Sequence, residues 1–401
     1  MSWLRRVATV ALVSLLALAA LWLALRLAGL DATRALMALW DGSFGSGYAL
    51  TSSTLVRATP LILTGLAVAI AFRAGVWNIG AEGQLLVGAA SAAAVGLLAT
   101  PLFGVFTVVV ALLVGAAAGA LWAWIAAYLR NRFGVLEVIS TIMLNFVALY
   151  AVGYLVRGPL QEPTHVYPQS EPLPGVAQLP KLIEGSRLHW GFVLAVLAAP
   201  AAWWVMRYTA AGFRVRAVGE NPSAARIAGM VDVERTTMRV FLASGALAGL
   251  AGAIELTGVT FALYENVSPG YGYTAIAVAL LAGLDSLGVL ATGLLFGALE
   301  AGALAMQREA AVPAVVVNVV EALLVLLILA VAKWRGGSTM LSRLAGAGGI
   351  GGGGDAGDGS GGLASAAGDT VGRDGATKGS HGDGTMPNAL SSSSTRAEVR
   401  G

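Results

Sequence analysis

The sequence predicts an all-α polytopic membrane protein with about 8–10 transmembrane helices, some of them interrupted. Of its 401 residues, 57% are hydrophobic and only 12% are charged, and a water-soluble core of this size could not hide so much apolar surface. The apolar residues form runs near or above the roughly 18–20 that a helix needs to cross a bilayer. The ten-residue alternation typical of transmembrane barrel strands does not occur.

Composition also excludes several kinds of site. The chain contains no cysteine, so it can form neither a disulfide framework nor a thiolate metal site. Its net charge is only +3, and the basic residues gather in a few loops instead of covering one face, so we expect no nucleic-acid partner.

The first apolar run extends from Val7 to about Leu27, after Arg5 and Arg6. It is longer than the roughly 7–15-residue apolar region of a signal peptide. We therefore interpret residues 1–30 as a retained first transmembrane helix or anchor. The alternative is a signal peptide that is cleaved after a small residue near Ala20.

Residues 31–340 are predicted to form one transmembrane domain. A polar segment leads to Thr54, and a hydrophilic loop rich in proline extends from Arg157 to Trp190. The other long apolar runs, each a predicted span, are Leu55–Phe72, Leu85–Leu98, Leu102–Tyr128, Val135–Val156, Gly191–Met206, Val240–Val259, Leu287–Ala305 and Val312–Ala332.

One apolar stretch, Thr274–Gly283, is too short for an upright span. If it counts as a crossing, all arginine-rich loops fall on one side of the membrane, and the positive-inside rule gives ten crossings with both termini in the cytoplasm. If it is re-entrant, the later helices must be arranged differently. Beyond it, residues 345–401 are rich in Gly and Ser with few large apolar side chains, and we expect this tail to be disordered.

A polar, glycine-punctuated break separates two apolar segments at residues 73–84. Gly75, Gly80 and Gly83 disfavour a regular helix, and polar side chains there would be costly to expose to lipid. Such backbone is tolerated at membrane depth where it is buried in protein or lines a cavity, as in transporters with interrupted helices. An ordinary cytoplasmic loop is the alternative.

The break supplies most of the candidate pathway residues. The Trp77 side chain offers a flat apolar face to a sugar or base, or else serves as an interfacial anchor. Asn145, with Glu137 and Thr141, occupies one face of a predicted span, where it either faces the pathway or bonds a neighbouring helix. The predicted pathway residues are Trp77, Asn78, Glu82, Gln84 and Asn145. Asn318 and Glu321 are interpreted as structural.

The loop 207–239 carries six arginines. Within it, Asn221 or Ser223 is predicted to cap a short helix that has Pro222 in its first turn and ends at Gly229. A short helix on the cytoplasmic face is suited to docking a soluble partner. The alternative is a helix that lies on anionic lipid.

Two motifs resemble one family. Phe72-Arg-Ala-Gly-Val-Trp-Asn-Ile-Gly-Ala-Glu-Gly-Gln-Leu-Leu-Val-Gly-Ala89 resembles the signature of ABC importer permease subunits in the branched-chain amino acid and simple-sugar group, and is most similar to nucleoside-type permeases. The stretch Gly219–Gly229 resembles their cytoplasmic coupling loop, in which Ser223 stands where the motif has glutamate. The likeness covers roughly residues 50–335.

The resemblance implies a translocation path for nucleosides or related small polar solutes, with simple sugars or branched-chain amino acids as alternatives. It implies a multi-pass protein of the bacterial plasma (inner) membrane. The expected partners are ABC ATPase subunits, a second permease subunit that is a paralogue, and an extracellular binding lipoprotein or periplasmic binding protein. The implied ATPase-coupling residues are Arg214, Arg216, Gly219, Asn221, Ser223, Ala224, Ala225 and Gly229.

No phosphate-binding loop occurs in the sequence, and its three lysines stand in no such context. We therefore expect no bound cofactor and no enzymatic activity, with ATP-Mg held by the partner ATPases. An ion-coupled secondary transporter is one rival. An integral membrane enzyme is another, but the three histidines have no ligand spacing and lie in a loop and the tail.

Overall fold

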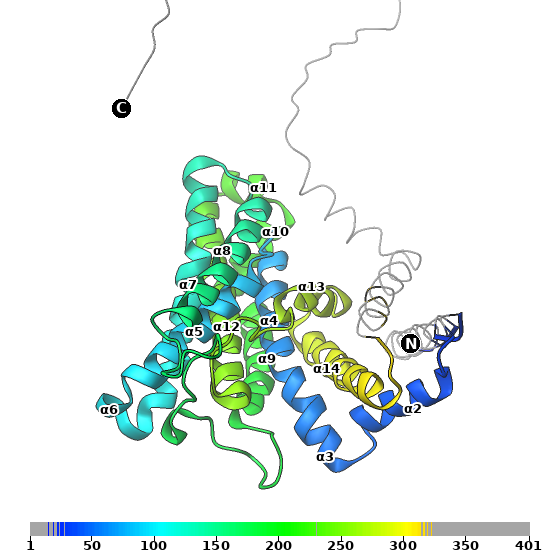
Figure 1. The fold of residues 1–401 in the computed structure, drawn as a ribbon. Helices are drawn as coiled ribbons and strands as arrows, with labels where there is room; N and C mark the ends of the chain where they lie inside the picture. Colours follow the sequence, from blue (N-terminus) through cyan, green and yellow to red (C-terminus); the bar gives the residue numbers. More distant parts are fainter. Residues whose placement is uncertain are drawn as a thin grey trace, which may run out of the picture. The chain divides into compact units, whose positions relative to one another are not determined.

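The computed structural model describes residues 29–229 and 231–313, together with scattered positions at 15–27 and 316–322 (Figure 1). Within this part of the chain, seven helices are long and apolar enough to cross a membrane. They are Gly47–Arg73, Ala81–Leu98, Thr100–Phe133, Glu137–Arg157, Trp190–Tyr208, Val233–Thr260 and Ser286–Glu309.

These helices confirm an all-α, polytopic membrane protein and seven of the predicted spans. The runs 7–27 and 312–332 lie largely outside the described residues, and so do Asn318, Glu321 and the tail at 345–401.

The bounds of the elements follow the chain order, with α for α-helices and η for short π or 3-10 helices. They are α2 (Ala32–Ser43), α3 (Gly47–Ala49), η1 (Leu50–Thr54), α4 (Leu55–Arg73), α5 (Ala81–Leu98), α6 (Thr100–Phe103), η2 (Gly104–Phe106), α7 (Thr107–Phe133), α8 (Glu137–Arg157), η3 (Gly175–Ala177), α9 (Trp190–Tyr208), α10 (Ala210–Glu220), α11 (Pro222–Ile227), α12 (Val233–Glu255), η4 (Leu256–Thr260), α13 (Tyr271–Leu281) and α14 (Ser286–Glu309).

The segment before Leu55 differs from the expectation of a polar connection. Asp31 caps α2 by accepting hydrogen bonds from the backbone N–H groups of Thr33 and Arg34, as carboxylates do at helix starts. The helix then packs against α14, where the Ser43 hydroxyl donates to the Ala298 carbonyl at 2.6 Å. Its small residues bury one face although the segment lacks a long apolar run.

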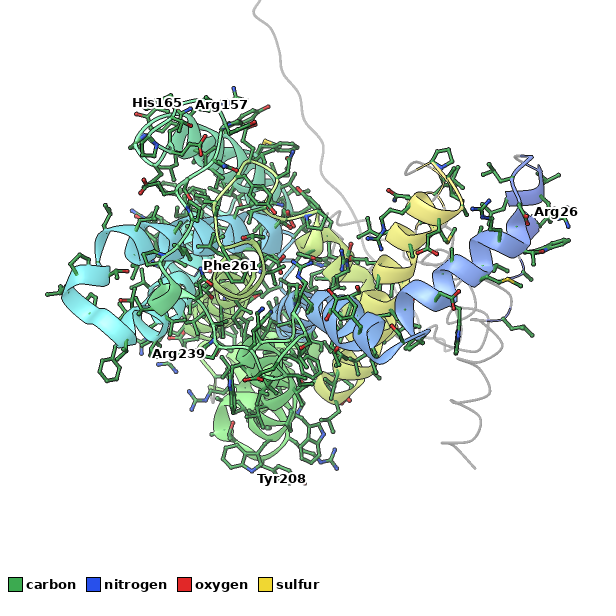
Figure 2. The ribbon with its side chains drawn as sticks, turned by 60° about the horizontal axis from the view of Figure 1, so that its bottom comes forward. Arg26, Arg157, His165, Tyr208, Arg239 and Phe261 are labelled. Carbon is green, nitrogen blue, oxygen red and sulfur yellow. The ribbon has the colours of Figure 1, made fainter. Side chains whose placement is uncertain are left out.

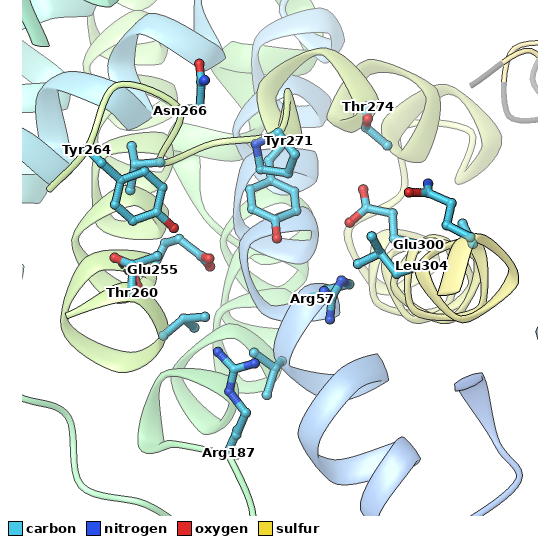
Figure 3. Close-up of a pocket in the computed structure, with 16 residues that line it drawn as sticks. Arg57, Arg187, Glu255, Thr260, Tyr264, Asn266, Tyr271, Thr274, Glu300 and Leu304 are labelled. Atoms are coloured by element: carbon cyan, nitrogen blue, oxygen red, sulfur yellow. Dashed lines mark hydrogen bonds between the residues drawn. The ribbon is translucent and has the colours of Figure 1, made fainter. Parts of the chain in front are cut away.

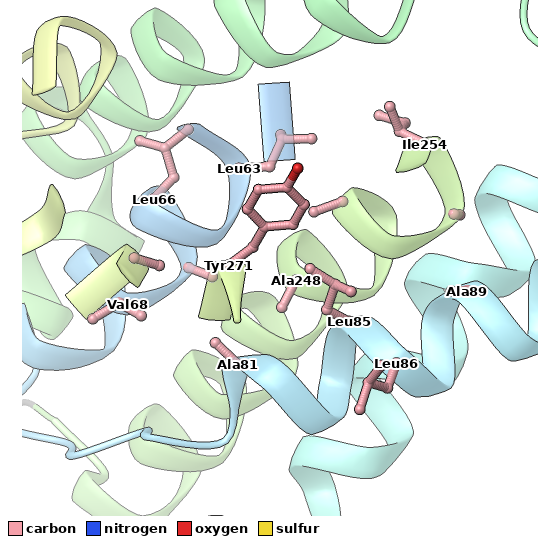
Figure 4. Packing of buried hydrophobic residues seen from close by; sticks show 14 of the residues in the cluster. Leu63, Leu66, Val68, Ala81, Leu85, Leu86, Ala89, Ala248, Ile254 and Tyr271 are labelled. Carbon is pink, nitrogen blue, oxygen red and sulfur yellow. The ribbon is translucent and has the colours of Figure 1, made fainter. Parts of the chain in front are cut away.

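Two helices form the centre of the bundle. In the spans that contain α4 and α12, 83% and 72% of the residues in the apolar window are buried, compared with 22–28% in those of α7, α8 and α9. Figure 4 shows the resulting core, in which Leu63 and Leu66 of α4 lie near Tyr271 of α13 and Leu85 of α5. The outer helices expose large apolar side chains, as expected of surfaces that face lipid.

Small residues bring α7 and α12 together. Gly115 and Gly119 on α7 face Gly245 and Gly249 on α12, and a Cβ atom at Gly249 would collide with the backbone of both α7 glycines. Both pairs have the four-residue spacing that allows close approach of membrane helices. The packing of these two spans therefore depends on the absence of side chains.

The short apolar stretch forms α13. Together with the loop before it, α13 extends along α4 from one end of that helix to the other. Tyr264 and Arg57 line the same cavity, whereas the Leu284 carbonyl accepts a hydrogen bond from the Arg73 guanidinium at 3.0 Å. Arg57 and Arg73 are 16 residues apart on α4, or about 24 Å along a helix. Residues 264–284 therefore make a crossing that is part loop and part helix.

Candidate functional site

The predicted break at residues 73–84 is a shorter loop, residues 74–80, between α4 and α5, because Glu82, Gly83 and Gln84 already lie in the first turn of α5. Gly75, with φ of +71°, ends the turn that follows α4. The Asn78 side chain is fully buried; its Nδ2 donates to Ser244 Oγ at 2.9 Å and to Gln84 Oε1 at 3.1 Å. Its Oδ1 accepts from Gly80 N at 3.0 Å and from Gln84 Nε2 at 2.9 Å. These bonds replace those of the missing helical turn.

Side chains on one face of α8 form hydrogen bonds with the backbone of the break. Glu137 Oε1 accepts from Trp77 N at 3.4 Å, and Thr141 Oγ1 accepts from Ile79 N at 3.3 Å. Asn145 accepts from Gly83 N at 2.8 Å and donates to the Ile79 carbonyl at 2.9 Å and the Tyr273 hydroxyl at 3.3 Å. The prediction that Glu137, Thr141 and Asn145 share a helix face is confirmed.

Glu82 connects the break to α13. Its carboxylate is buried, and Oε2 accepts from Gly272 N at 2.7 Å in the first turn of α13. The Ser268 side chain also hydrogen-bonds to it. A Cβ atom at Gly272 would collide with the backbone at Glu82, so the two helix starts are in direct contact.

The five predicted pathway residues therefore gather around one loop. Trp77 packs on Phe72 with ring centroids 4.9 Å apart and is half-buried. The side chains of Asn78, Glu82, Gln84 and Asn145 are each 0–6% exposed and hydrogen-bonded within the chain. This geometry is that of a loop fastened to α8, α12 and α13, named the hinge below for the role proposed for it; contact with solute remains a prediction.

The predicted short helix in loop 207–239 is confirmed as α11. Asn221 caps it by accepting from Ala224 N at 2.9 Å, Pro222 occupies the first turn, and Gly229 follows with φ of +66°. Arg226 pairs with Glu234. The Ile227 side chain is 87% exposed, which makes it the apolar tip of this surface.

The other predicted coupling residues surround α11. Ser223 and Ala224 are exposed, whereas Ala225 packs with Val218 and Val231. On α10, Arg214 Nε donates to the Ala210 carbonyl at 3.2 Å. Arg216 lines a second, smaller cavity that also includes Arg73. Figure 1 shows α10 and α11 at the end of the bundle opposite to α3 and α6.

The hinge and the α10–α11 segment touch. A Cβ atom at Gly219 would collide with the Arg73 carbonyl, and one at Gly75 would lie 3.7 Å from Gly219 Cα. Only glycine allows this approach of the last turn of α10 to the end of α4. Two motifs that are 130 residues apart in the sequence therefore form one contact.

A polar cavity of about 590 Å³ lies at the other end of α4. Its charged lining comes from Arg57 on α4, Glu255 on α12, Glu300 on α14 and Arg187 in the long loop. Figure 3 shows these side chains directed toward a common space beneath Tyr264 and Tyr271. The long loop marks this end of the bundle: Arg157 and His165 lie opposite to Tyr208 in Figure 2.

Two π-helical turns adjoin the cavity. The turn η1 ends three residues before Arg57, and η4 begins directly after Glu255. Phe261 follows η4 with φ of +57°. Single π turns occur frequently at functional sites, where they change the direction in which neighbouring side chains point.

One group beside the membrane-spanning part has a defined protonation state. Burial, together with Arg187, lowers the pKa of His189 to about 4. The neutral imidazole accepts from Gly191 N through Nδ1 at 3.2 Å and thereby caps α9.

Residues 50–332 match the family described as branched-chain amino acid transport system / permease component. The chain belongs to this permease family. The matched range includes the break, α10–α11 and the residues that line the cavity.

Several permeases of named solutes are similar to this chain. The guanosine ABC transporter permease protein of Bacillus subtilis is 42% identical over 78% of this chain and 90% of its own length. The glucose ABC transporter permease protein of Haloferax volcanii is 40% identical over 69% and 75%. The nucleoside ABC transporter permease protein of Lactococcus lactis is 31% identical over 72% and 81%.

Sequence reasoning missed the cavity. In the sequence, Glu255 and Glu300 stand near the ends of predicted spans, where a carboxylate can reach water, yet Glu255 is only 5% exposed. An arginine in the first turn of a predicted span, at Arg57, is the signal that could have indicated a partner inside the membrane.

Proposed function

We propose that this chain is the permease subunit of an ATP-driven ABC importer that carries nucleosides or related small polar solutes. The similarity to guanosine and nucleoside permeases supports this solute class, and the similarity to a glucose permease supports simple sugars as the second candidate. Transport proceeds by alternation between outward-open and inward-open states that ATPase partners stabilise to different extents.

The observation that carries the proposal is the contact between α10 and the hinge. A partner that moves α11 would move Gly219 against the Arg73 carbonyl. The hinge would pass this displacement through Glu82 to Gly272 on α13. In this proposal Trp77, Asn78, Glu82, Gln84 and Asn145 position the path's walls.

Membership in the permease family supports the remaining parts of the proposal. The chain itself performs no hydrolysis and binds no cofactor; ATP-Mg belongs to separate ATPase subunits that dock on α11. A paralogous permease completes the pore, as the two different guanosine permeases of Bacillus subtilis suggest. A binding protein delivers solute to the outer face of the bacterial plasma membrane.

Ile227→Asp tests the docking surface. We expect this variant to reach the membrane at the normal level but to lose co-purification of the ATPase, because a charged side chain replaces the exposed apolar tip of α11. Gly229→Arg should act in the same direction, since a side chain at φ of +66° distorts the end of the helix.

Ile183→Asp is the matched control, because Ile183 is an exposed isoleucine in the long loop. Normal ATPase recovery with Ile227→Asp would contradict docking on α11 and favour a helix that lies on lipid. Solute uptake driven by an ion gradient without any ATPase would overturn the importer proposal itself.

A further inference from the structure

We propose that the polar cavity between α4, α12, α13 and α14 is a binding site for a neutral, ring-bearing polar solute, with the Glu255 carboxylate as its main hydrogen-bond acceptor. This inference rests on the proposed function, because it identifies where in the permease the solute binds.

Glu255 is the central observation. It is 5% exposed, and among the described residues its Oε2 atom has no hydrogen-bond partner. An unpartnered buried carboxylate oxygen costs free energy. Glu255 lines the cavity, so a small rotation of its side chain would bring this buried oxygen to a solute that donates a hydrogen bond and thereby recovers that cost.

The surrounding charges limit the net charge of the solute. Arg57 and Arg187 act electrostatically on Glu255, and Glu300 adds a second carboxylate to the lining. The lining therefore combines two arginines with two carboxyl groups, and neither kind of group dominates it. An anion would face two carboxylates and a cation would face two arginines, whereas a neutral solute can use the donors and acceptors of both.

The shape and aromatic lining favour a ring. The volume of about 590 Å³ falls within the roughly 300–1,000 Å³ of small-molecule sites. Tyr264 and Tyr271 add phenol rings with hydroxyl groups, which combine apolar contact with hydrogen bonding. Within the proposed solute class, we expect the cavity to bind a neutral nucleoside more tightly than the nucleoside 5′-monophosphate, because the phosphate adds negative charge beside two carboxyl groups.

The location agrees with this role. The cavity adjoins the Arg57 end of α4, whereas α10 contacts the Arg73 end about 24 Å away. Tyr271 is also the residue before Gly272, which Glu82 holds against the hinge. The cavity therefore lies far from the α11 surface. A series of contacts through α10, the hinge and α13 connects the two.

The absence of cysteine from the chain allows a direct test. Thr274→Cys places one thiol in the cavity lining, and Thr164→Cys places one in the exposed part of the long loop. In membranes that contain the complete importer, guanosine should slow maleimide labelling of Thr274→Cys about tenfold at saturation. It should leave Thr164→Cys unchanged, and guanosine 5′-monophosphate should protect neither.

Glu255→Gln provides the second measurement. It preserves the shape but replaces an acceptor oxygen by a donor, so the KM for guanosine uptake should rise about tenfold or more. Membrane level and ATPase recovery should remain normal. Glu265→Gln is the matched control, because Glu265 lies in the loop between η4 and α13, pairs with Arg157 at 2.8 Å and does not line the cavity.

The outcomes separate the two proposals. If the unmodified importer takes up neither nucleosides nor sugars, the proposed function fails. If it takes up guanosine but Thr274→Cys is not protected, or Glu255→Gln transports with an unchanged KM, the binding-site inference is wrong while the permease assignment stands. If Glu255→Gln does not accumulate, the labelling of Thr274→Cys still decides.

Discussion

Single amides determine the hinge. Asn78 and Asn145 both lie in predicted polar positions, and both use their side chains to satisfy backbone or amide groups that a continuous helix would have paired internally. Such groups cost several kcal/mol each when left unsatisfied in hydrocarbon. The polar side chains of Asn78 and Asn145 are therefore explained by the need to pair backbone groups where the helix is interrupted.

Asn145→Leu tests this conclusion. The substitution leaves Gly83 N–H and the Ile79 carbonyl without partners, at about 1–3 kcal/mol each. We expect a lower unfolding temperature of the purified protein and reduced uptake. Met143→Leu on the exposed face of α8 should behave normally. An unchanged unfolding temperature with a raised KM would instead identify Asn145 as a solute contact.

Among the elements, small residues set how closely the spans approach. The α7–α12 interface is built from glycines whose backbones touch, because apolar attraction alone does not join helices in lipid. The same reliance on glycine occurs where α10 meets α4 and where α13 meets α5. In the proposed change between outward-open and inward-open states, the helices must either keep these glycine contacts or slide along them.

Gly249→Ala tests the interface of α7 and α12. The added methyl group would collide with the backbone at Gly115 and Gly119, and overpacking of this kind costs about 1–3 kcal/mol. We expect the unfolding temperature to fall by roughly 2–10 °C. Gly47→Ala, which adds a methyl group in open space, should leave it unchanged; equal stability of both variants would disprove the close packing.

Across the whole molecule, three local features form one continuous series of contacts. The α10 helix touches the end of α4 at Gly219, Glu82 joins the hinge to Gly272, and the neighbouring Tyr271 lines the cavity. Spatial continuity alone does not demonstrate coupling. This series of contacts does show which residues can be altered to interrupt coupling without changing the α11 surface or the cavity.

Gly219→Val tests that series of contacts. Its side chain would collide with the Arg73 carbonyl while the exposed surface of α11 remains intact. We expect normal ATPase recovery with at least about tenfold slower uptake, since only the link to the hinge is displaced. Gly175→Val, in open space within η3, is the control. Wild-type uptake by Gly219→Val would exclude this route.

Much of the fold could be predicted because its signals are local. Apolar length located seven described spans, and the Asn-Pro cap with its terminal glycine located α11. The convergence of Arg57, Glu255 and Arg187 could not be predicted, because it depends on how helices distant in sequence pack and on two π turns that have no composition signal.

Residues 264–284 take part both in the cavity and in the packing of the bundle. The loop half contributes Tyr264, Asn266 and Val267 to the cavity, whereas the helical half adds Tyr271 and Thr274 and also packs against the hinge and α14. A loop can accept substitutions that a packed helix cannot. If the cavity binds the solute as proposed, substitutions in this loop change the solute that is carried without altering the contacts of α13 with the hinge and α14. We expect nucleoside and sugar permeases to diverge first in that loop.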